Sequence, residues 1–506
     1  MKFDIQLLNN KGFNWINLDN IWVKGYAFNS ENNYLTEVEL AQSLHLVKDI
    51  VEFGQVISSL NGIFSVVIKL QNSTLLATDI TRAFPLFYTK VKETYIVTDN
   101  AVLLQKNLKL QMSEKSKKEF LCTGFVTGSK TLLTGLHQVQ SAEVVEINNS
   151  GVHQFEYWTY ATKDLTNKDF RKLQLNLLSI YERLIKRLIK MANGKTIVIP
   201  LSGGYDSRLV LALLVKYGYK KVHCFTYGVS TSFEISIAER VTKRLGINLT
   251  TINYSNTFID EHFNKSEIFD YIRYGSNFVS LSHVQDFLAV KYLNLNNLIP
   301  EDAIFVPGHS GDIFAGTHLS VLINGLSKPE LVKQEITKKH FTLNEGCKGD
   351  INYYNESYLP FSSMEAWSWK ERQAKFIVNS LRIYEYFNYQ FALPLWDSEL
   401  ASFFKKIPLK LKNRNKYQDY KIENNLYDSV TFQIFREFDI AFEKIEENQI
   451  FRKILNRLIG IFSNKKDLIN NFDYFIAKLS KENLHKQGSK GTNSELVNIY
   501  IEILKR

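Results

Sequence analysis

Short apolar runs separated by polar turn residues fill the first 160 residues of the chain. The runs Ile63–Leu70, Ser73–Ile80 and Glu93–Asn100 are rich in β-branched and aromatic residues. Runs of this length and composition, bounded by turn residues, are typical of β-strands. The N-terminal part of the chain therefore predicts a domain that is rich in strands.

Between Thr166 and Gly194 the apolar spacing changes to three and four residues, which indicates an amphipathic helix that ends at the glycine. The apolar positions of this helix are Leu173, Leu177, Ile180, Leu184 and Leu188. We place a domain boundary before it, which divides the chain into residues 1–165 and 166–506.

Continuous apolar runs then alternate with helical patterns. The predicted strands are residues 196–201, 222–228 and 248–254, and the helices between them are residues 206–218 and 234–246. Apolar strands that alternate with helices indicate a parallel α/β sheet. From about Ser320 onward the pattern is mostly helical, and the sequence shows no internal repeat.

Composition adds little to this picture but excludes some classes of protein. The chain has 506 residues, 45% of them hydrophobic and 23% charged, which is typical of a folded protein with two or more domains. The net charge is +10, but the lysines are scattered. The densest basic patch, Lys405–Lys416, lacks the interleaved aromatic residues that stack on bases, so we expect no nucleic-acid partner.

The cysteines and the N-terminus bear on the compartment. Cys122, Cys224 and Cys347 are odd in number and far apart, which predicts neither a disulfide framework nor a zinc site. The first residues lack an apolar signal core, and no run has the length of a membrane span. We therefore expect a cytoplasmic protein without stable membrane insertion.

The segment Leu201–Ser207 reads LSGGYDS and joins the first strand of the predicted parallel sheet to a helix. Open α/β sheets bind ligands at this edge, and a helix N-terminus favours an anion. The two glycines let backbone N–H groups turn toward a phosphate, and Asp206 suits such a site if Mg²⁺ joins it. The simpler alternative is a helix N-cap that binds nothing. The loop is not a Walker A motif, because no Lys-Ser/Thr pair follows the second glycine.

Three segments resemble the asparagine synthetase group of ATP-pyrophosphatases. SGGYDS is similar to the pyrophosphate loop of that family, VPGHSGDIFAG (Val306–Gly316) to its second motif, and FALPLWDSEL (Phe391–Leu400) to a third. The resemblance implies an enzyme that splits ATP into AMP and pyrophosphate while it adenylates a carboxylate. It implies Mg²⁺ at Asp206 and Asp312. The implied ATP-binding residues are Leu201, Ser202, Gly203, Gly204, Asp206, Ser207, Tyr227 and Gly308.

The N-terminal part resembles the Ntn-type glutaminase domain of the same family. KGYAFN (Lys24–Asn29), LNGIFSVVIKL (Leu60–Leu70) and TDITRAFPLFY (Thr78–Tyr88) are similar to three of its segments. Residue 2 is lysine where the family carries its catalytic cysteine, and Lys24 replaces an asparagine of the oxyanion site. Without a thiolate there is no nucleophile, so the resemblance implies a scaffold domain and not a glutaminase.

The expected fold is therefore an α+β Ntn-hydrolase-like domain followed by an α/β parallel-sheet synthetase domain with a mostly helical C-terminal part. His309 occupies the position in the second motif that faces the adenylate in the family, so it is the candidate base; a histidine packed in a turn is the alternative. His283 begins a predicted helix, where it either caps the helix or touches the substrate, and we favour the structural role. The candidates for the cation that stabilises the leaving pyrophosphate are Lys416, Lys375 and Arg382.

These observations predict an ATP-dependent amide ligase that lacks its own glutaminase. The GHSGD segment of the second motif (Gly308–Asp312) resembles that of family relatives associated with polysaccharide synthesis. It therefore favours a uronic acid or another glycan-linked carboxylate, with an amine or ammonia as the second substrate. Two alternatives remain: a cyclase of the lasso-peptide or β-lactam synthetase type, and a non-catalytic scaffold. A homodimer stays open.

Overall fold

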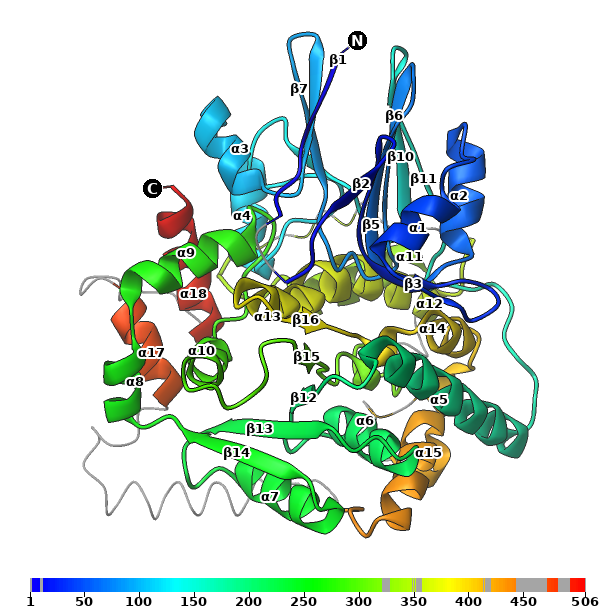
Figure 1. Ribbon diagram of the computed structural model, residues 1–506, viewed down its shortest axis with the longest axis vertical. Coiled ribbons are helices and arrows are strands. Elements are labelled where there is room, and N and C mark those ends of the chain that lie inside the picture. The colour runs from blue at the N-terminus through cyan, green and yellow to red at the C-terminus, as the bar shows by residue number, and fades with distance from the viewer. Residues whose placement is uncertain are drawn as a thin grey trace.

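The structure is a computed structural model that describes residues 2–9, 12–320, 328–347, 349, 351, 357–412, 414, 420–442, 471–480 and 492–505. The N-terminal domain contains two β-sheets, at the top of Figure 1. The larger has the order β11-β10-β6-β5-β3-β2, with β4 paired to β3, and the smaller has the order β1-β8-β7-β9. The strands of the larger sheet are β2 (Ile16–Leu18), β3 (Ile21–Phe28), β4 (Tyr34–Leu35), β5 (Asn61–Lys69), β6 (Ser73–Thr78), β10 (Glu143–Asn148) and β11 (Gly151–Glu156). Those of the smaller sheet are β1 (Lys2–Gln6), β7 (Phe87–Val91), β8 (Thr94–Thr98) and β9 (His137–Gln138).

The two sheets pack face to face between two layers of helices. Val67 and Leu76 of the larger sheet meet Tyr88 and Val97 of the smaller one in a shared apolar cluster. Helices α1 (Glu37–Ser43) and α2 (Ile50–Ser58) cover the other face of the larger sheet. On the outer side of the smaller sheet lie α3 (Ala101–Leu108) and α4 (Glu114–Thr123). This order of helix, sheet, sheet and helix confirms the predicted Ntn-like domain.

The helix expected between the domains is α5 (Phe170–Ala192). The Asp169 carboxylate accepts a hydrogen bond from the Lys172 backbone N–H at 2.9 Å and so caps the N-terminus. Asn193, in the left-handed region, and Gly194 end the helix. The predicted amphipathic pattern is confirmed, because the predicted apolar positions of this helix are buried.

The second domain contains a five-stranded parallel sheet of order β14-β13-β12-β15-β16. Each predicted strand and helix of this region is present, so the predicted α/β architecture is confirmed. The strands are β12 (Ile197–Pro200), β13 (Val222–Gly228), β14 (Asn248–Asn253), β15 (Ile304–Phe305) and β16 (Gln390–Phe391). The accompanying helices are α6 (Tyr205–Lys216), α7 (Phe233–Leu245), α8 (Asn256–His262), α9 (Lys265–Ser276) and α10 (Phe287–Leu295).

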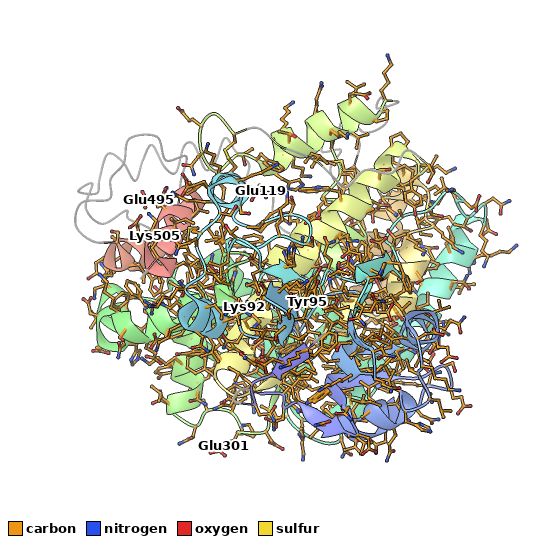
Figure 2. The ribbon with its side chains drawn as sticks, turned by 90° about the horizontal axis from the view of Figure 1, so that it is seen from above. Lys92, Tyr95, Glu119, Glu301, Glu495 and Lys505 are labelled. Carbon is orange, nitrogen blue, oxygen red and sulfur yellow. A yellow bond between two sulfur atoms is a disulfide. The ribbon has the colours of Figure 1, made fainter. Side chains whose placement is uncertain are left out.

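Most of the described C-terminal part is helical, as expected. It adds one strand to the sheet, β16, and a π-helical segment, η3 (Ser368–Ile377). Figure 2 shows Glu495 of α18 on the same side of the molecule as Glu119 of α4, on which α18 packs. Among the described helices, none is both long and apolar enough to cross a membrane. The helices of this part include α11 (Pro329–His340), α12 (Pro360–Trp367), α13 (Arg382–Tyr386), α14 (Ser398–Phe404), α15 (Leu426–Glu437), α17 (Asn471–Leu479) and α18 (Thr492–Leu504).

A disulfide between Cys122 and Cys347 joins the two domains, so the expectation that the cysteines form no disulfide is wrong. Cys122 lies in α4, and Cys347 lies after α11. The two cysteines are 225 residues apart in the sequence. Their spacing in the sequence carries no sign of this pairing, because only the docking of the domains brings them together. Cys224 remains a buried free thiol.

Polar contacts also hold the domains together. The Arg187 guanidinium donates to the Asn32 side-chain oxygen of the N-terminal domain at 3.0 Å, and Asn61 of that domain donates to the Asp397 carboxylate at 3.0 Å. The Trp369 indole N–H donates to the Ile80 carbonyl at 2.7 Å. These contacts fix the position of the helices that surround the carboxyl edge of the parallel sheet.

Candidate functional site

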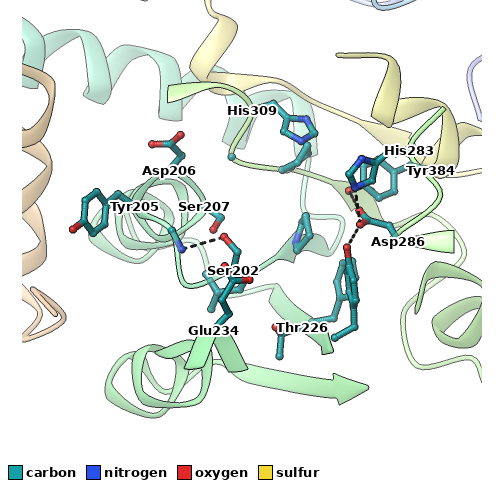
Figure 3. A pocket seen from close by; sticks show the side chains of 17 residues that line it. Ser202, Tyr205, Asp206, Ser207, Thr226, Glu234, His283, Asp286, His309 and Tyr384 are labelled. Atoms are coloured by element: carbon teal, nitrogen blue, oxygen red, sulfur yellow. Dashed lines mark hydrogen bonds and ion pairs between the residues drawn. The ribbon is translucent and has the colours of Figure 1, made fainter. Parts of the chain in front are cut away.

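A cavity of about 300 Å³ opens at the carboxyl edge of the parallel sheet. The ends of β12, β13 and β15 line it, together with α6, the start of α7 and residues before α10. Figure 3 shows the residues of the loop after β12 on one side of the cavity and a group of polar side chains around Asp286 on the other. Ligands of open α/β sheets bind at this edge.

The SGGYDS loop forms the start of α6 as the sequence predicts. Gly204 is the N-cap of α6 and offers no side chain to the first-turn N–H groups. The Ser202 hydroxyl accepts from the Gly204 N–H at 3.2 Å, and the buried Ser207 hydroxyl has no hydrogen-bond partner among the described residues. A helix N-terminus without a side-chain cap, next to an unpaired hydroxyl, suits a phosphate.

The second motif packs directly on this loop, and two glycines allow it. A Cβ atom on Gly308 would lie 2.3 Å from the Ser207 backbone nitrogen. A Cβ atom on Gly311 would lie 2.0 Å from the Tyr427 hydroxyl oxygen and 2.7 Å from an Asp206 carboxylate oxygen. Any side chain at either position would therefore push the two motifs apart.

This packing places Asp206 beside Asp312. The Asp312 backbone N–H donates to one Asp206 carboxylate oxygen at 2.8 Å, and the Tyr427 hydroxyl donates to the other at 2.9 Å. Burial, followed by the Asp312 carboxylate, raises the pKa of Asp206 to about 7, although Arg414 opposes the shift. Two carboxylates held together in this way indicate that a cation belongs between them.

Mg²⁺ fits this pair. The ion prefers oxygen ligands, and protein sites usually supply one or two carboxylates while water and phosphate oxygens complete the octahedron. Within the described ranges, no group of three or more His, Cys, Asp or Glu side chains forms a fuller ligand set. Asp206 and Asp312 would therefore hold Mg²⁺ together with the phosphates of a nucleotide.

We expect Mg²⁺ to raise the melting temperature more at pH 8 than at pH 6. In the metal-free protein the Asp206 pKa is about 7, above its ordinary value of 3.8, so the charged carboxylate costs stability as the pH rises through that window. The ion binds the charged form, so below pH 7 it must displace a proton and loses up to ~10-fold in affinity per pH unit. Thermal denaturation at the two pH values checks this. The prediction is wrong if Mg²⁺ raises the melting temperature equally at both pH values. It is also wrong if Mg²⁺ raises the melting temperature of Asp206→Asn as much as that of the unaltered protein.

The far end of the cavity carries the group around Asp286, the residue before α10. The Tyr227 and Tyr384 hydroxyls donate to its carboxylate, and Nε2 of His283 lies 3.3 Å from its Oδ1 atom. Burial by itself would raise the Asp286 pKa, but His283 and the hydrogen bonds outweigh burial and hold it below the usual value. The sequence offered capping of α10 as a role for His283, but Asp286 takes the N-cap position. His283 lines the cavity instead.

His309 lines the same cavity, between the loop and Asp286 (Figure 3). Its Nδ1 atom lies 3.4 Å from the Ser380 hydroxyl. Burial, and then the charge of His283, lower the pKa of His309 to about 4. The structure therefore places His309 where the sequence predicts, as an imidazole that stays neutral at physiological pH.

Of the residues proposed to stabilise the leaving pyrophosphate, Lys375 and Arg382 do not line the cavity. Lys375 is buried, donates to the Gly128 carbonyl at 2.7 Å and pairs with Glu371, so it joins the domains instead. Arg382 pairs with Glu385 away from the loop. Lys416 lies outside the described residues.

Sequence reasoning missed two arginines near the carboxylates. Arg414 pairs with Asp428 and is electrostatically coupled to Asp206. The half-buried Arg372 is coupled to Asp312, and no hydrogen bond or ion pair of its guanidinium is found within the part of the chain that the structure describes. Arg372 lies in the π-helical segment η3, where a helical wheel of ordinary period misplaces the side chains, so the sequence offered no usable signal.

We expect Arg372→Ala to reduce pyrophosphate release from ATP by ~10²-fold or more, because a cation that is electrostatically coupled to Asp312 would also stabilise the negative charge that develops on the leaving group. Lys375→Met should instead lower the melting temperature and leave the rate per folded molecule nearly unchanged, because it leaves Glu371 unpaired at the domain contact. Steady-state assays and thermal denaturation of both variants test the assignment. If instead Lys375→Met loses pyrophosphate release and Arg372→Ala does not, Lys375 is the cation that stabilises the leaving pyrophosphate.

Comparisons with known proteins match both domains. Residues 7–158 match the glutamine amidotransferase domain, and residues 185–293 match asparagine synthase. The Microcin J25-processing protein McjC of Escherichia coli is 23% identical over 217 residues, which cover 42% of this chain and 40% of that protein. The match thus spans less than half of that relative.

Two solved structures are also similar, each with a TM-score of 0.20, and we draw no argument from them. The NH3-dependent NAD synthetase of Campylobacter jejuni is 18% identical, with 29% of this chain and 61% of that chain covered. The glutamine phosphoribosylpyrophosphate amidotransferase of B. subtilis is 12% identical, with 64% and 70% covered. The two domain matches, together with the carboxylate pair and the loop, support an asparagine synthetase-like family, with an amidotransferase-type domain before an asparagine synthase-type domain.

Proposed function

We propose that the protein is an ATP-dependent amide ligase that activates a carboxylate as an acyl-adenylate and releases pyrophosphate. The observation that carries the proposal is the pair Asp206 and Asp312 beside the uncapped N-terminus of α6. This arrangement offers a cation site and a phosphate site in one cavity. A scaffold protein would have no use for a second carboxylate that raises the pKa of Asp206.

The chain's own residues would bind and orient ATP. The N–H groups of the loop and the Ser207 hydroxyl would receive the phosphates, while Leu201, Tyr227 and Gly308 line the part of the cavity left for the nucleoside. Mg²⁺ at Asp206 and Asp312 would neutralise charge on the phosphates. Arg372 would then stabilise the leaving pyrophosphate, and the carboxylate of the second substrate would form the bond to the α-phosphorus.

We further propose that the amine does not come from glutamine hydrolysed by the N-terminal domain. Lys24, at the position of the family asparagine, is buried and pairs with Glu385 of the synthetase domain at 2.6 Å. The side chain at this position therefore forms a salt bridge with Glu385 and is not free to donate a hydrogen bond to an oxyanion. The domain carries no cysteine before Cys122, which is bonded to Cys347.

Two substrate classes remain candidates. The sequence favours a uronic acid or another glycan-linked carboxylate. The similarity to a microcin-processing protein over 42% of the chain instead favours a peptide whose carboxylate and amine are joined. Of the two, we propose the peptide class first, because it rests on a matched relative and the glycan class rests on the style of one motif.

Carboxylate-dependent exchange of labelled pyrophosphate into ATP tests this function. Purified protein with Mg-ATP is given separate pools of uronic acids, amino acids and short peptides with free carboxylates. Exchange with one pool supports an adenylating ligase and identifies the class of acid. Absence of exchange in every pool, together with absence of Mg-ATP binding by calorimetry, would overturn the proposal.

A further inference from the structure

The end of the cavity opposite the phosphate loop holds an imidazole on a fixed carboxylate. His283 lies with Nε2 at 3.3 Å from Asp286 Oδ1, and 40% of its side chain is exposed, while the Asp286 side chain is 11% exposed. Both residues line the cavity, and Figure 3 shows them facing the side on which His309 lies. Because Nε2 faces the carboxylate, Nδ1 is the ring nitrogen left for another partner.

Asp286 is held in place from several elements. The Tyr227 hydroxyl, at the end of β13, donates to Oδ1, and the Tyr384 hydroxyl, from α13, donates to Oδ2 at 3.3 Å. Burial, and then the charge of Asp286, raise the pKa of Tyr254 well above the usual value. The tyrosines therefore stay protonated, and among these groups the carboxylate is the negative charge that His283 meets.

His309 is less suited to hold a proton. Its hydrogen-bond neighbour is the Ser380 hydroxyl, at 3.4 Å. The charges of Asp286 and Asp312 also act on His309, but no carboxylate of the described residues forms an ion pair with it. An imidazole that gains a proton is stabilised by a carboxylate at its other nitrogen, which also fixes the tautomer. His283 has that partner and His309 does not.

We propose that His283, oriented by Asp286, takes the proton from the attacking amine; this inference rests on the proposed function. The amine arrives as an ammonium ion, and Nδ1 of His283 takes one of its protons while Asp286 stabilises the imidazolium. The neutral amine nitrogen then forms a bond to the acyl carbon, and the bond from that carbon to the AMP oxygen breaks, so its electron pair leaves with AMP. The second proton on the nitrogen leaves with the AMP phosphate. His309 stays neutral beside the adenylate. The amine substrate is of the basic class, which arrives as an ammonium ion and is attracted by the Asp286 carboxylate.

Assays with two different amines distinguish proton transfer by His283 from its other possible roles. Methylamine is protonated at neutral pH and must give a proton to a base before it can attack, whereas hydroxylamine is largely unprotonated and can attack without this first transfer. Pyrophosphate exchange measures the adenylation step alone. The variants are His283→Gln and Asp286→Asn, and His45→Gln, at an exposed histidine of the N-terminal domain, is the matched control.

With the acid that gives the strongest exchange, we expect both variants to keep pyrophosphate exchange within about threefold, and amide formation with methylamine to fall by ~10²-fold or more. Hydroxamate formation with hydroxylamine should stay within about threefold, and the methylamine rate of the variants should recover as the pH rises. His45→Gln should match the unaltered protein in all assays.

Several outcomes would overturn the inference. Equal losses of exchange and amide formation would assign His283 to ATP binding or folding, and equal losses with both amines would exclude proton transfer. Unchanged rates with methylamine would show that His283 is not needed. If the unaltered protein shows no exchange with any acid, the proposed function itself fails, a result distinct from these three.

Discussion

Replacing Asp206 by asparagine is expected to lower carboxylate-dependent pyrophosphate release by ~10³-fold or more and to leave the protein folded. The amide keeps the size of the carboxylate and can still accept from the Tyr427 hydroxyl or the Asp312 N–H. It cannot supply the negative oxygen that a cation needs. Initial rates at saturating Mg-ATP, compared with the unaltered protein, give the ratio.

The same substitution should raise the melting temperature in the absence of Mg²⁺ at pH 8. Burial and Asp312 raise the Asp206 pKa to about 7, so at pH 8 the folded protein holds a charge that it disfavours. Asparagine removes that charge, and functional sites commonly trade stability for activity in this way. Loss of activity with a lower melting temperature would mean that Asp206 serves the fold, and retained activity would exclude it as the metal ligand.

Lys412→Met is expected to destabilise the synthetase domain by ~3–5 kcal/mol at pH 8, because it leaves the buried Glu365 carboxylate with only the His318 Nε2 atom, at 3.7 Å, in place of a lysine. The two side chains are fully buried and lie 2.8 Å apart, between α12 and the segment that follows Leu411. Burial raises the Glu365 pKa to about 7 even with Lys412 present. Protonation of Glu365 relieves the loss, so the effect should be smaller at pH 6 than at pH 8. Urea denaturation at both pH values measures it.

Two control variants show whether the pair itself is responsible. The double variant Lys412→Met/Glu365→Leu should recover most of the stability, because an apolar pair replaces an ionic one of similar volume. Lys186→Met breaks the exposed pair with Glu182 on α5 and should cost ~0.5 kcal/mol or less. If the double variant stays as unstable as the single one, the loss comes from packing around the Lys412 stem and not from the unpaired charge.

The candidate site was only partly readable from the sequence. Asp206 and Asp312 could be assigned because each belongs to a contiguous motif whose local backbone positions it. The sequence favoured a structural role for His283 over contact with the substrate, because its partner Asp286 acts only together with Tyr227 and Tyr384 from other elements. Lys375 was misplaced for a related reason: it lies in a π-helical segment, where the spacing of an ordinary helix does not tell which side chains face the cavity.

The sequence by itself determined the strands and helices, the order of the two domains and the phosphate loop. These features depend on the periodicity of apolar residues and on turn and cap residues within a few positions of one another, and such local effects are written along the chain. The tertiary structure alone decided the Cys122–Cys347 bond, the salt bridge between Lys24 and Glu385, and the groups that surround Asp286. Each of these joins residues far apart in the chain, and their proximity depends on how the domains and helices pack, which no local pattern encodes.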